Sequence, residues 1–277
     1  MSGYFADQPI VPGADVIYRP KGNAGEYAPL ATNPYKGCGH GCKYCYVPNA
    51  THIDRGLFNA GAVPRADFLP RLRSDIGRYR RAGVCDGHPA DQVLITFSSD
   101  PFHPGDLGHT EETIITLKNG GMAFCTLSKG GARALPFMGL YRPSRDAYAA
   151  SLTGLDGAFS RMWEPDAAMP WERIETLRRF YEAGIFTWVS LEPTLDAQAS
   201  IDIVKETHEF VELYKIGKAN YVKKVSDAID WRDYVERVTA TCRALRKQHY
   251  VKLDLQQFLP PGYHNPLRIP QHRGALA

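Results

Sequence analysis

Three cysteines lie close together in this sequence at a spacing that suits metal chemistry. Cys38, Cys42 and Cys45 form the pattern CX3CX2C and have no fourth cysteine nearby. An iron–sulfur cluster is normally held by four cysteine thiolates, so a cluster held by these three would leave one iron with open coordination positions. Such an iron can bind a further molecule directly. The spacing therefore predicts a [4Fe-4S] cluster with one open iron.

Two other uses of the cysteines have to be compared with this prediction. A zinc site is possible with Cys85 or His88 as a distant fourth ligand, although zinc ribbons usually present two cysteine pairs. A disulfide framework is not expected, because Cys85, Cys125 and Cys242 are far apart and no secretory signal opens the chain. His40, inside the first gap of the motif, is interpreted as a loop residue that offers a hydrogen bond.

Composition limits the class of protein. With 277 residues, 44% hydrophobic and 23% charged, the chain can bury one substantial core. No apolar run approaches the length of a membrane span, so we expect a cytoplasmic protein with reduced thiols, a monomer without membrane association. The net charge of +3 neither requires nor opposes a polyanionic partner.

Short apolar runs alternate with longer helical patterns along the chain. The runs are almost continuous in apolar residues, as parallel strands buried on both faces are. They predict strands at 32–36, 93–97, 122–127, 147–152, 185–191 and 211–216. Val251, Leu253 and Leu255 alternate with polar residues, which predicts a half-exposed closing strand.

Three helices are predicted from apolar residues at helical spacing. The first carries its stripe over 68–79. The third follows an N-cap at Asp230 and makes Cys242 a core residue. The second begins at Pro170, ends at Gly184 and buries a stripe of Trp171, Ile174, Leu177 and Tyr181. Together with the strands, this order predicts an α/β fold with a parallel sheet.

Polar residues follow several of the predicted strands. In parallel α/β barrels the chemistry gathers at the carboxyl ends of the strands. An ordinary turn or a solvated loop would explain any one of these residues alone. At successive strand ends, however, they predict one binding site, formed by Ser98, Ser99, Asp100, Lys129, Ser151 and Glu192.

Taken in order, these segments resemble the radical S-adenosylmethionine (SAM) superfamily, and within it the spore photoproduct lyase-like branch. The matching segments are GCGHGCKYCY at 37–46, SSD at 98–100, LSK at 127–129, ASL at 150–152 and WEP at 163–165. The resemblance covers roughly residues 33–193, about three-fifths of the chain, and is specific only in combination.

The resemblance implies a partial (β/α)6 TIM-type barrel over residues 31–257, with the [4Fe-4S] cluster loop after the first strand. Residues 1–30 are then an N-terminal arm and 258–277 a Pro-rich C-terminal tail. In this superfamily the open iron chelates SAM, and one electron splits SAM to methionine and a 5′-deoxyadenosyl radical. An external donor such as flavodoxin or ferredoxin is implied as the source of that electron.

The resemblance also implies roles for single residues. Lys129 and Ser151 would contact SAM, with Ser99 nearby. Tyr44 would pack beside the adenine, and Tyr46 would line the substrate cavity. Ser98, Asp100 and Glu192 complete the residues that we expect at the cofactor.

One residue departs from the lyase pattern. The lyases carry a hydrogen-donating cysteine on the second strand, where this chain has Phe97. A phenyl ring cannot donate a hydrogen atom, so the substrate radical is quenched by hydrogen from 5′-deoxyadenosine, by donation from Tyr46 or Cys125, or by loss of an electron. We therefore expect rearrangement or group transfer on a thymine-type base rather than dimer repair.

Basic residues give modest evidence for a nucleic-acid partner. Arginines crowd one helix, and lysines follow the sixth strand beside Tyr214 and Tyr221. Such groups suit a phosphate backbone with unstacked bases, although a solvated helix face and a flexible loop explain them equally well. The residues are Arg71, Arg73, Arg78, Arg80, Arg81, Lys215, Lys218, Lys223 and Lys224. A radical SAM enzyme for a peptide or small metabolite, and a zinc-stabilised nucleic-acid-binding module without catalysis, stay open as alternatives.

Overall fold

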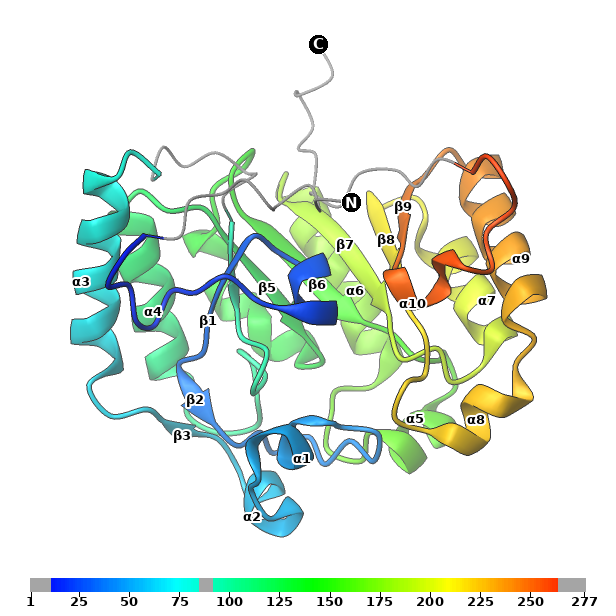
Figure 1. The fold of residues 1–277 in the computed structure, drawn as a ribbon, viewed down its shortest axis with the longest axis horizontal. Coiled ribbons are helices and arrows are strands. Elements are labelled where there is room, and N and C mark those ends of the chain that lie inside the picture. The colour runs from blue at the N-terminus through cyan, green and yellow to red at the C-terminus, as the bar shows by residue number, and fades with distance from the viewer. Residues whose placement is uncertain (1–10, 85–91, 264–277) are drawn as a thin grey trace.

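A seven-stranded sheet forms the centre of the structure (Figure 1). The computed structural model describes residues 11–84 and 92–263. Neighbouring strands are all parallel and follow one another in chain order, so each connection leads to the next position in the sheet. This is the partial barrel that the sequence predicted. Its strands are β1 (Leu30–Thr32), β4 (Val93–Ile95), β5 (Phe124–Ser128), β6 (Ala147–Ser151), β7 (Phe186–Leu191), β8 (Leu213–Ile216) and β9 (Gln248–Val251).

Helices cover the outer face of the sheet. In Figure 1, α3 and α4 lie at the end of the sheet near β1, and α7 and α9 lie at the end near β9. The principal helices are α3 (Phe68–Arg81), α4 (Gly108–Asn119), α6 (Pro170–Glu182), α7 (Ala197–Thr207) and α9 (Trp231–Ala244). Shorter ones are η1 (Gly22–Glu26), α1 (Val47–Thr51), α2 (Arg55–Asn59), η3 (Gly131–Leu140), α5 (Gly157–Trp163), α8 (Lys223–Ala228) and α10 (Leu253–Gln256).

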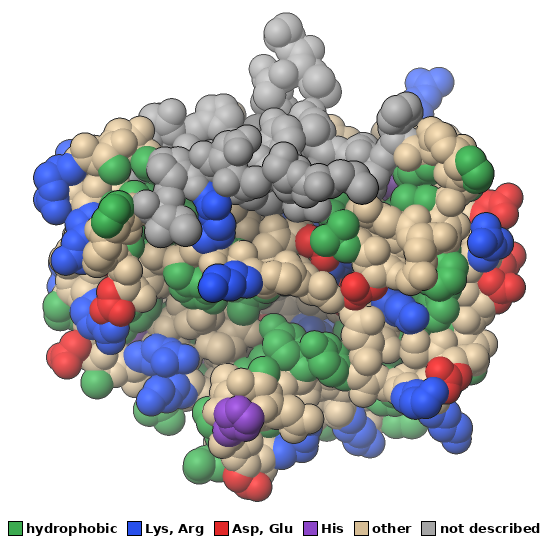
Figure 2. All heavy atoms as spheres, viewed as in Figure 1, with side chains coloured by type: hydrophobic (Ala, Val, Ile, Leu, Met, Phe, Trp, Pro, Cys, Tyr) green, Lys and Arg blue, Asp and Glu red, His purple; other side chains and the backbone are tan. Residues whose placement is uncertain are grey.

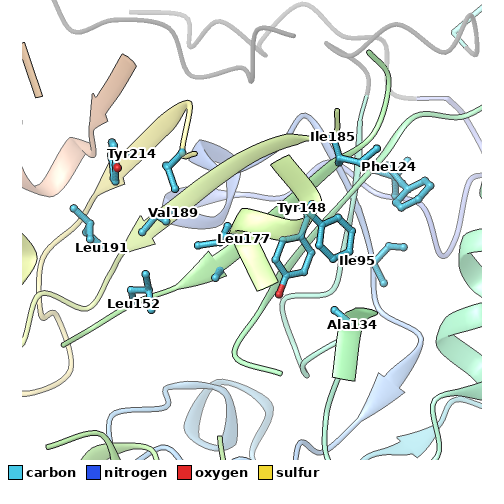
Figure 3. Packing of buried hydrophobic residues seen from close by; sticks show 14 of the residues in the cluster. Ile95, Phe124, Ala134, Tyr148, Leu152, Leu177, Ile185, Val189, Leu191 and Tyr214 are labelled. Carbon is cyan, nitrogen blue, oxygen red and sulfur yellow. The ribbon is translucent and has the colours of Figure 1, made fainter. Parts of the chain in front are cut away.

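Both faces of the sheet are buried, as the continuous apolar runs predicted. Figure 3 shows the core between the sheet and the outer helices, where Tyr148 of β6 and Leu177 of α6 meet. Tyr148 stacks on Phe180 with ring centroids 4.0 Å apart. A second cluster lies on the other face of the same strands, inside the barrel, and contains Cys125 and Trp188. Side chains therefore fill the lower part of the barrel.

The first expected strand is divided in the structure. Residues 30–32 form β1, while β2 (Tyr35–Lys36) leaves the main sheet and pairs with β3 (Val63–Pro64) in a separate two-stranded ribbon. The break falls at Asn33 and Pro34. Proline has no backbone N–H to donate to a ladder, and the Asn33 side chain instead accepts hydrogen bonds from Phe97 N (2.8 Å) and Ser98 N (3.1 Å). The prediction of one strand over 32–36 was wrong.

The expected closing strand was also wrong in position and exposure. β9 ends at Val251, and the chain turns into α10, which buries Leu255 and exposes Leu253. Lys252, which the alternation placed on an exposed face, is 1% exposed. Its backbone N–H donates to Ile216 O at 2.9 Å, so the ladder to β8 continues to this residue and carries its side chain inward.

The predicted helices are present, with one change of face. Asp230 caps α9 by accepting from Arg232 N (3.0 Å) and Asp233 N (3.1 Å), and Cys242 is buried as expected. In α6 the inward face carries Arg173 and Phe180, whereas Trp171 is 56% exposed. Arg173 is buried because it forms an ion pair, described below. The apolar residues alone therefore predicted the wrong buried face for this helix. Over residues 11–84 and 92–263, none of the helices has both the length and the apolar character that crossing a membrane requires.

Candidate active site

A cavity of about 520 Å³ opens at the carboxyl ends of the strands. This volume is in the range of cofactor and ligand sites. Figure 2 shows the hollow at the centre of one face, above a patch of hydrophobic side chains. Residues of successive strand ends line it, among them Thr96, Leu127, Ser151, Ser190 and Lys252. Cys38, Cys42 and Cys45 line the same cavity.

The loop that carries the cysteines is fixed by backbone hydrogen bonds. Cys38 N donates to Phe58 O (2.9 Å), Lys43 N donates to Trp163 O (2.9 Å), and Arg55 Nη2 donates to Cys45 O (2.9 Å). Gly37 begins the loop with φ +77°, and a Cβ there would come within 2.2 Å of the carbonyl oxygen of Gly61. Only glycine fits this position. The sequence thus builds a rigid loop that presents three thiols to one cavity.

The three thiols line one cavity and are the candidate ligands of a metal cluster. Within the described ranges, no group of three His, Cys, Asp or Glu side chains is placed to hold a single metal ion. Burial raises the pKa of Cys42 to about 12, so its thiolate requires a positive partner, as a metal cluster provides. Cys85 and His88, either of which would be the fourth ligand of the alternative zinc site, lie outside the described residues.

A buried charge network supports the cysteine side of the cavity. Glu164 and Arg173 form an ion pair of 2.6 Å in which both side chains are 1% exposed. Tyr44 and Thr153 donate hydrogen bonds to the same Glu164 carboxylate. Burial alone would raise the pKa of Glu164, but the Arg173 and Lys129 charges hold it below its usual value. Glu164 and Arg173 were not among the predicted site residues, although Glu164 lies inside the matched segment WEP.

Lys129 lies between this network and the cysteines. Its ammonium group is 5.5 Å from the centre of the Tyr44 ring. Burial lowers the pKa of Lys129, but the charges of Cys42 and Glu164 raise it above its usual value, so the side chain stays protonated. The structure therefore brings a partly buried cation to the cavity wall near the thiols, and the predicted Lys129 lines the cavity.

His40 and Asp100 connect the cysteine loop to β5. The Asp100 carboxylate accepts from Ser128 Oγ (2.6 Å) and Lys129 N (2.7 Å), and lies 3.4 Å from His40 Nδ1. His40 Nε2 accepts from Arg133 Nη2 at 2.8 Å, which leaves the proton on Nδ1. Burial lowers the pKa of His40 to about 4, so the ring is neutral. Asp100 lines the cavity, but its oxygens are used mainly to hold the loop.

The three predicted serines have different surroundings. The hydroxyl of Ser99 is buried at the cavity and has no hydrogen-bond partner within the part of the chain that the structure describes. Ser151 lines the cavity, while its carbonyl oxygen accepts from Arg173 at 3.0 Å. Ser98 is directed to the carbonyl oxygen of Tyr35 and is not part of the lining. An unpaired buried hydroxyl needs a partner, so Ser99 fits a bound polar ligand.

The two predicted hydrogen-atom donors, Tyr46 and Cys125, differ in their position relative to the cavity. Tyr46 lines the cavity, and burial raises the pKa of its hydroxyl to about 12. Cys125 is 2% exposed within the inner cluster, and its sulfur accepts a hydrogen bond from Trp188 Nε1 at 3.3 Å. Phe97 lines the cavity and packs edge-on against Tyr27, with centroids 6.1 Å apart. Of the two donors, only Tyr46 is at the cavity surface.

A second polar cluster forms the far wall of the cavity. Glu192 accepts hydrogen bonds from Tyr27 and Lys252, and all three residues line the cavity. Glu26 is 1% exposed and accepts from Tyr250 Oη (2.9 Å) and Leu253 N (2.7 Å). Tyr27, Glu26 and Lys252 were not predicted, because their segments come from opposite ends of the chain. We refer to Glu26, Tyr27, Glu192 and Lys252 as the terminal wall.

The structure is similar to solved structures of SuiB and of spore photoproduct lyase, each of which has been solved with S-adenosylmethionine bound. SuiB from Streptococcus suis, bound to S-adenosylmethionine, matches with a TM-score of 0.59 over 80% of this chain, at 13% identity. Spore photoproduct lyase, complexed with dinucleoside spore photoproduct, matches with a TM-score of 0.64 over 87%, at 12% identity. The chain has the fold of the radical SAM enzymes.

The likeness extends over different shares of the two known proteins. This chain covers 79% of the lyase but only 46% of SuiB, so it spans less than half of the length of SuiB. Another lyase structure holds both S-adenosylmethionine and the dinucleoside lesion, with a TM-score of 0.62 and 12% identity over 81% of this chain and 76% of that one. No protein-family model and no curated protein matches the sequence.

Proposed function

We propose that this protein is a radical SAM enzyme that abstracts hydrogen from a thymine-type base, or a substituent of that base, in DNA. The observation that carries the proposal is that three thiols, Lys129, Ser151 and the unpaired Ser99 hydroxyl line one cavity. A [4Fe-4S] cluster held by these thiols would supply the electron that cleaves SAM to a 5′-deoxyadenosyl radical. Lys129 and Ser99 are positioned for the polar groups of SAM.

The mouth of the cavity supports a nucleic-acid substrate. Tyr46 and Tyr221 stack there with centroids 5.3 Å apart and an angle of 19° between the rings, and Tyr221 is 67% exposed. Lys21, Lys218 and Asn220 line the same cavity as Tyr46 and Tyr221. Exposed aromatic faces beside cations bind unpaired bases and their phosphates, and a base can enter a barrel mouth only when it is single-stranded or flipped out.

Two arginines of the predicted basic helix and one of the predicted lysines are engaged elsewhere. Arg71 pairs with Asp15, and Arg78 pairs with Asp75 at 3.1 Å. Lys215 and Tyr214 are both buried, contrary to the expectation that they belong to a basic aromatic loop. Lys215 points into the barrel because it alternates with Tyr214 on a strand buried on both faces. The nucleic-acid proposal therefore depends on the mouth and not on the arginine-rich helix.

The test is to incubate the reconstituted, reduced protein and SAM with single-stranded DNA containing thymine, with base-modified DNA and with spore-photoproduct DNA. We expect 5′-deoxyadenosine and a change of mass in a thymine-type base, both followed by mass spectrometry. SuiB has been crystallised with a precursor peptide, so peptides form a parallel arm of the assay. Cleavage of SAM with no change in any DNA would contradict the DNA substrate but not the radical chemistry. A colourless, zinc-containing protein would contradict both.

A further inference from the structure

The terminal wall offers one hydrogen-bond acceptor to the cavity. Both of its internal donors, Tyr27 Oη and Lys252 Nζ, bind the same oxygen of Glu192, Oε2. The other oxygen, Oε1, accepts no hydrogen bond from residues 11–84 or 92–263. Glu192 is 18% exposed and lines the cavity, whereas Lys252 is 1% exposed. Oε1 is thus an acceptor available to a bound molecule.

Glu192 already has a counter-ion within this wall. The Lys252 ammonium group, 1% exposed, donates a hydrogen bond to Glu192 and lies 3.9 Å from Glu26. Bringing a further charged group into this cluster has a desolvation cost, whereas a neutral N–H donor satisfies Oε1 without that cost. The wall therefore favours a neutral donor.

The surroundings favour a flat ring as the carrier of this donor. Phe97 lines the cavity next to Tyr27, and Tyr46 lines it on the side of the cysteines. Aromatic faces beside a partly buried acceptor suit a heterocycle with a ring N–H. In a thymine-type base that group is the imide N3–H on the pairing edge, the edge by which enzymes read a flipped base.

We infer that Glu192 Oε1 binds the ring N3–H of the substrate pyrimidine and so selects thymine-type bases over cytosine. This inference rests on the proposed function and names the contact that determines its specificity. Glu192 then belongs to the substrate side of the cavity and not, as the strand-end pattern predicted, to SAM. Cytosine has an acceptor at N3, so its lone pair would face the carboxylate oxygen.

The substitution Glu192→Gln reverses the polarity of this contact. Tyr27 and Lys252 both donate to the oxygen at the Oε2 position, so the Gln amide oxygen must occupy it. The amide NH2 then faces the cavity, where it repels N3–H and matches the acceptor of cytosine. Glu206, exposed on α7, provides the matched control as Glu206→Gln.

The experiment measures binding to the reconstituted full-length protein with SAM present, by fluorescence anisotropy. The probes are single-stranded oligodeoxyadenylates with one central thymidine, 3-methylthymidine or deoxycytidine. For the wild type and Glu206→Gln we expect the thymidine probe to bind about ten-fold more tightly than the other two, the effect of one hydrogen bond to a charged group. In Glu192→Gln this preference should disappear or turn toward deoxycytidine, with the affinity for SAM unchanged.

Two outcomes would overturn the inference alone. One is thymidine binding that neither N3 methylation nor Glu192→Gln alters, and the other is a Glu192→Gln protein that loses affinity for SAM instead of its base preference. Failure of the wild type to bind any of the three probes would overturn the DNA substrate of the proposed function together with this inference. The methylated probe changes only the ligand, so its result does not depend on how the variant folds.

Discussion

The cysteine side of the cavity, which we call the cysteine wall, differs from the terminal wall in how fully its charged side chains are paired with other residues. On the cysteine side, Glu164 and Arg173 are each 1% exposed and bound to one another, and His40 is held between Asp100 and Arg133. On the terminal wall, Glu192 is partly exposed and keeps one oxygen toward the cavity. Buried charged groups that are paired with each other fix the geometry of a site, whereas a partly exposed carboxylate with an unpaired oxygen is suited to bind a ligand. The cysteine wall therefore holds the cysteine loop in position, and the terminal wall presents an acceptor to the substrate.

The largest expected effect is loss of the iron–sulfur cluster, which should depend on the cysteine wall alone. Replacing Cys38, Cys42 or Cys45 with Ala should abolish cluster assembly and SAM cleavage, because fewer than three thiolates remain. Cys242→Ala, a change at a buried core residue, should retain the cluster. Iron and sulfide analysis checks both results. Full iron content in Cys42→Ala would refute the assignment of the cysteine wall.

The next effect concerns stability. Arg173→Met leaves the Glu164 carboxylate buried without its ion-pair partner, and we expect it to lower the free energy of unfolding by about 3–5 kcal/mol. Lys252→Met should cost less, because Glu192 has access to water in the cavity and Glu26 keeps its hydrogen bonds from Tyr250 and Leu253. Urea unfolding of both variants measures the difference. Equal losses would show that the terminal wall is as closed as the cysteine wall.

The free energy of unfolding should depend on pH because His40 is buried in the cysteine wall. The pKa of His40 is lowered from 6.5 to about 4, mainly by burial, so the folded protein favours the neutral ring. This stabilisation is complete above pH 6.5 and is lost as the pH falls toward 4, by up to about 3 kcal/mol. Urea unfolding of the iron-free protein at pH 4.5–7 should show this slope, and His40→Gln should lack it. The same slope in both proteins would mean that other groups cause it.

The smallest expected effect is on SAM itself. Lys129→Ala should weaken SAM binding by about 1.5–3 kcal/mol if its ammonium makes a charge-assisted contact, and Ser151→Ala should weaken it less. Calorimetry on the reconstituted protein gives both values, with Glu192→Gln as the comparison from the opposite wall. Unchanged affinity in Lys129→Ala would return this lysine to a structural role in the Glu164 network.

The sequence was sufficient for features that depend on local order. Periodicity and capping predicted α3 and α9, and the order of the strands brought Ser99, Lys129 and Ser151 to one cavity as expected. Features that depend on contacts between distant segments were missed. The alternation at 251–255 indicated an exposed lysine, because no local pattern shows that Glu26 and Glu192 lie beside Lys252. The role of Arg173 was missed for a similar reason, because its partner Glu164 lies on a different segment.

The contacts of Glu26 with the end of the chain set an order for assembly during synthesis. Its carboxylate binds Tyr250 and Leu253, residues that follow it by 224 and 227 positions. In Figure 1 the blue N-terminal segment crosses the front of the sheet to reach the neighbourhood of the orange α10. Synthesis must therefore pass residue 253 before this wall can close, and contacts of such sequence separation form slowly.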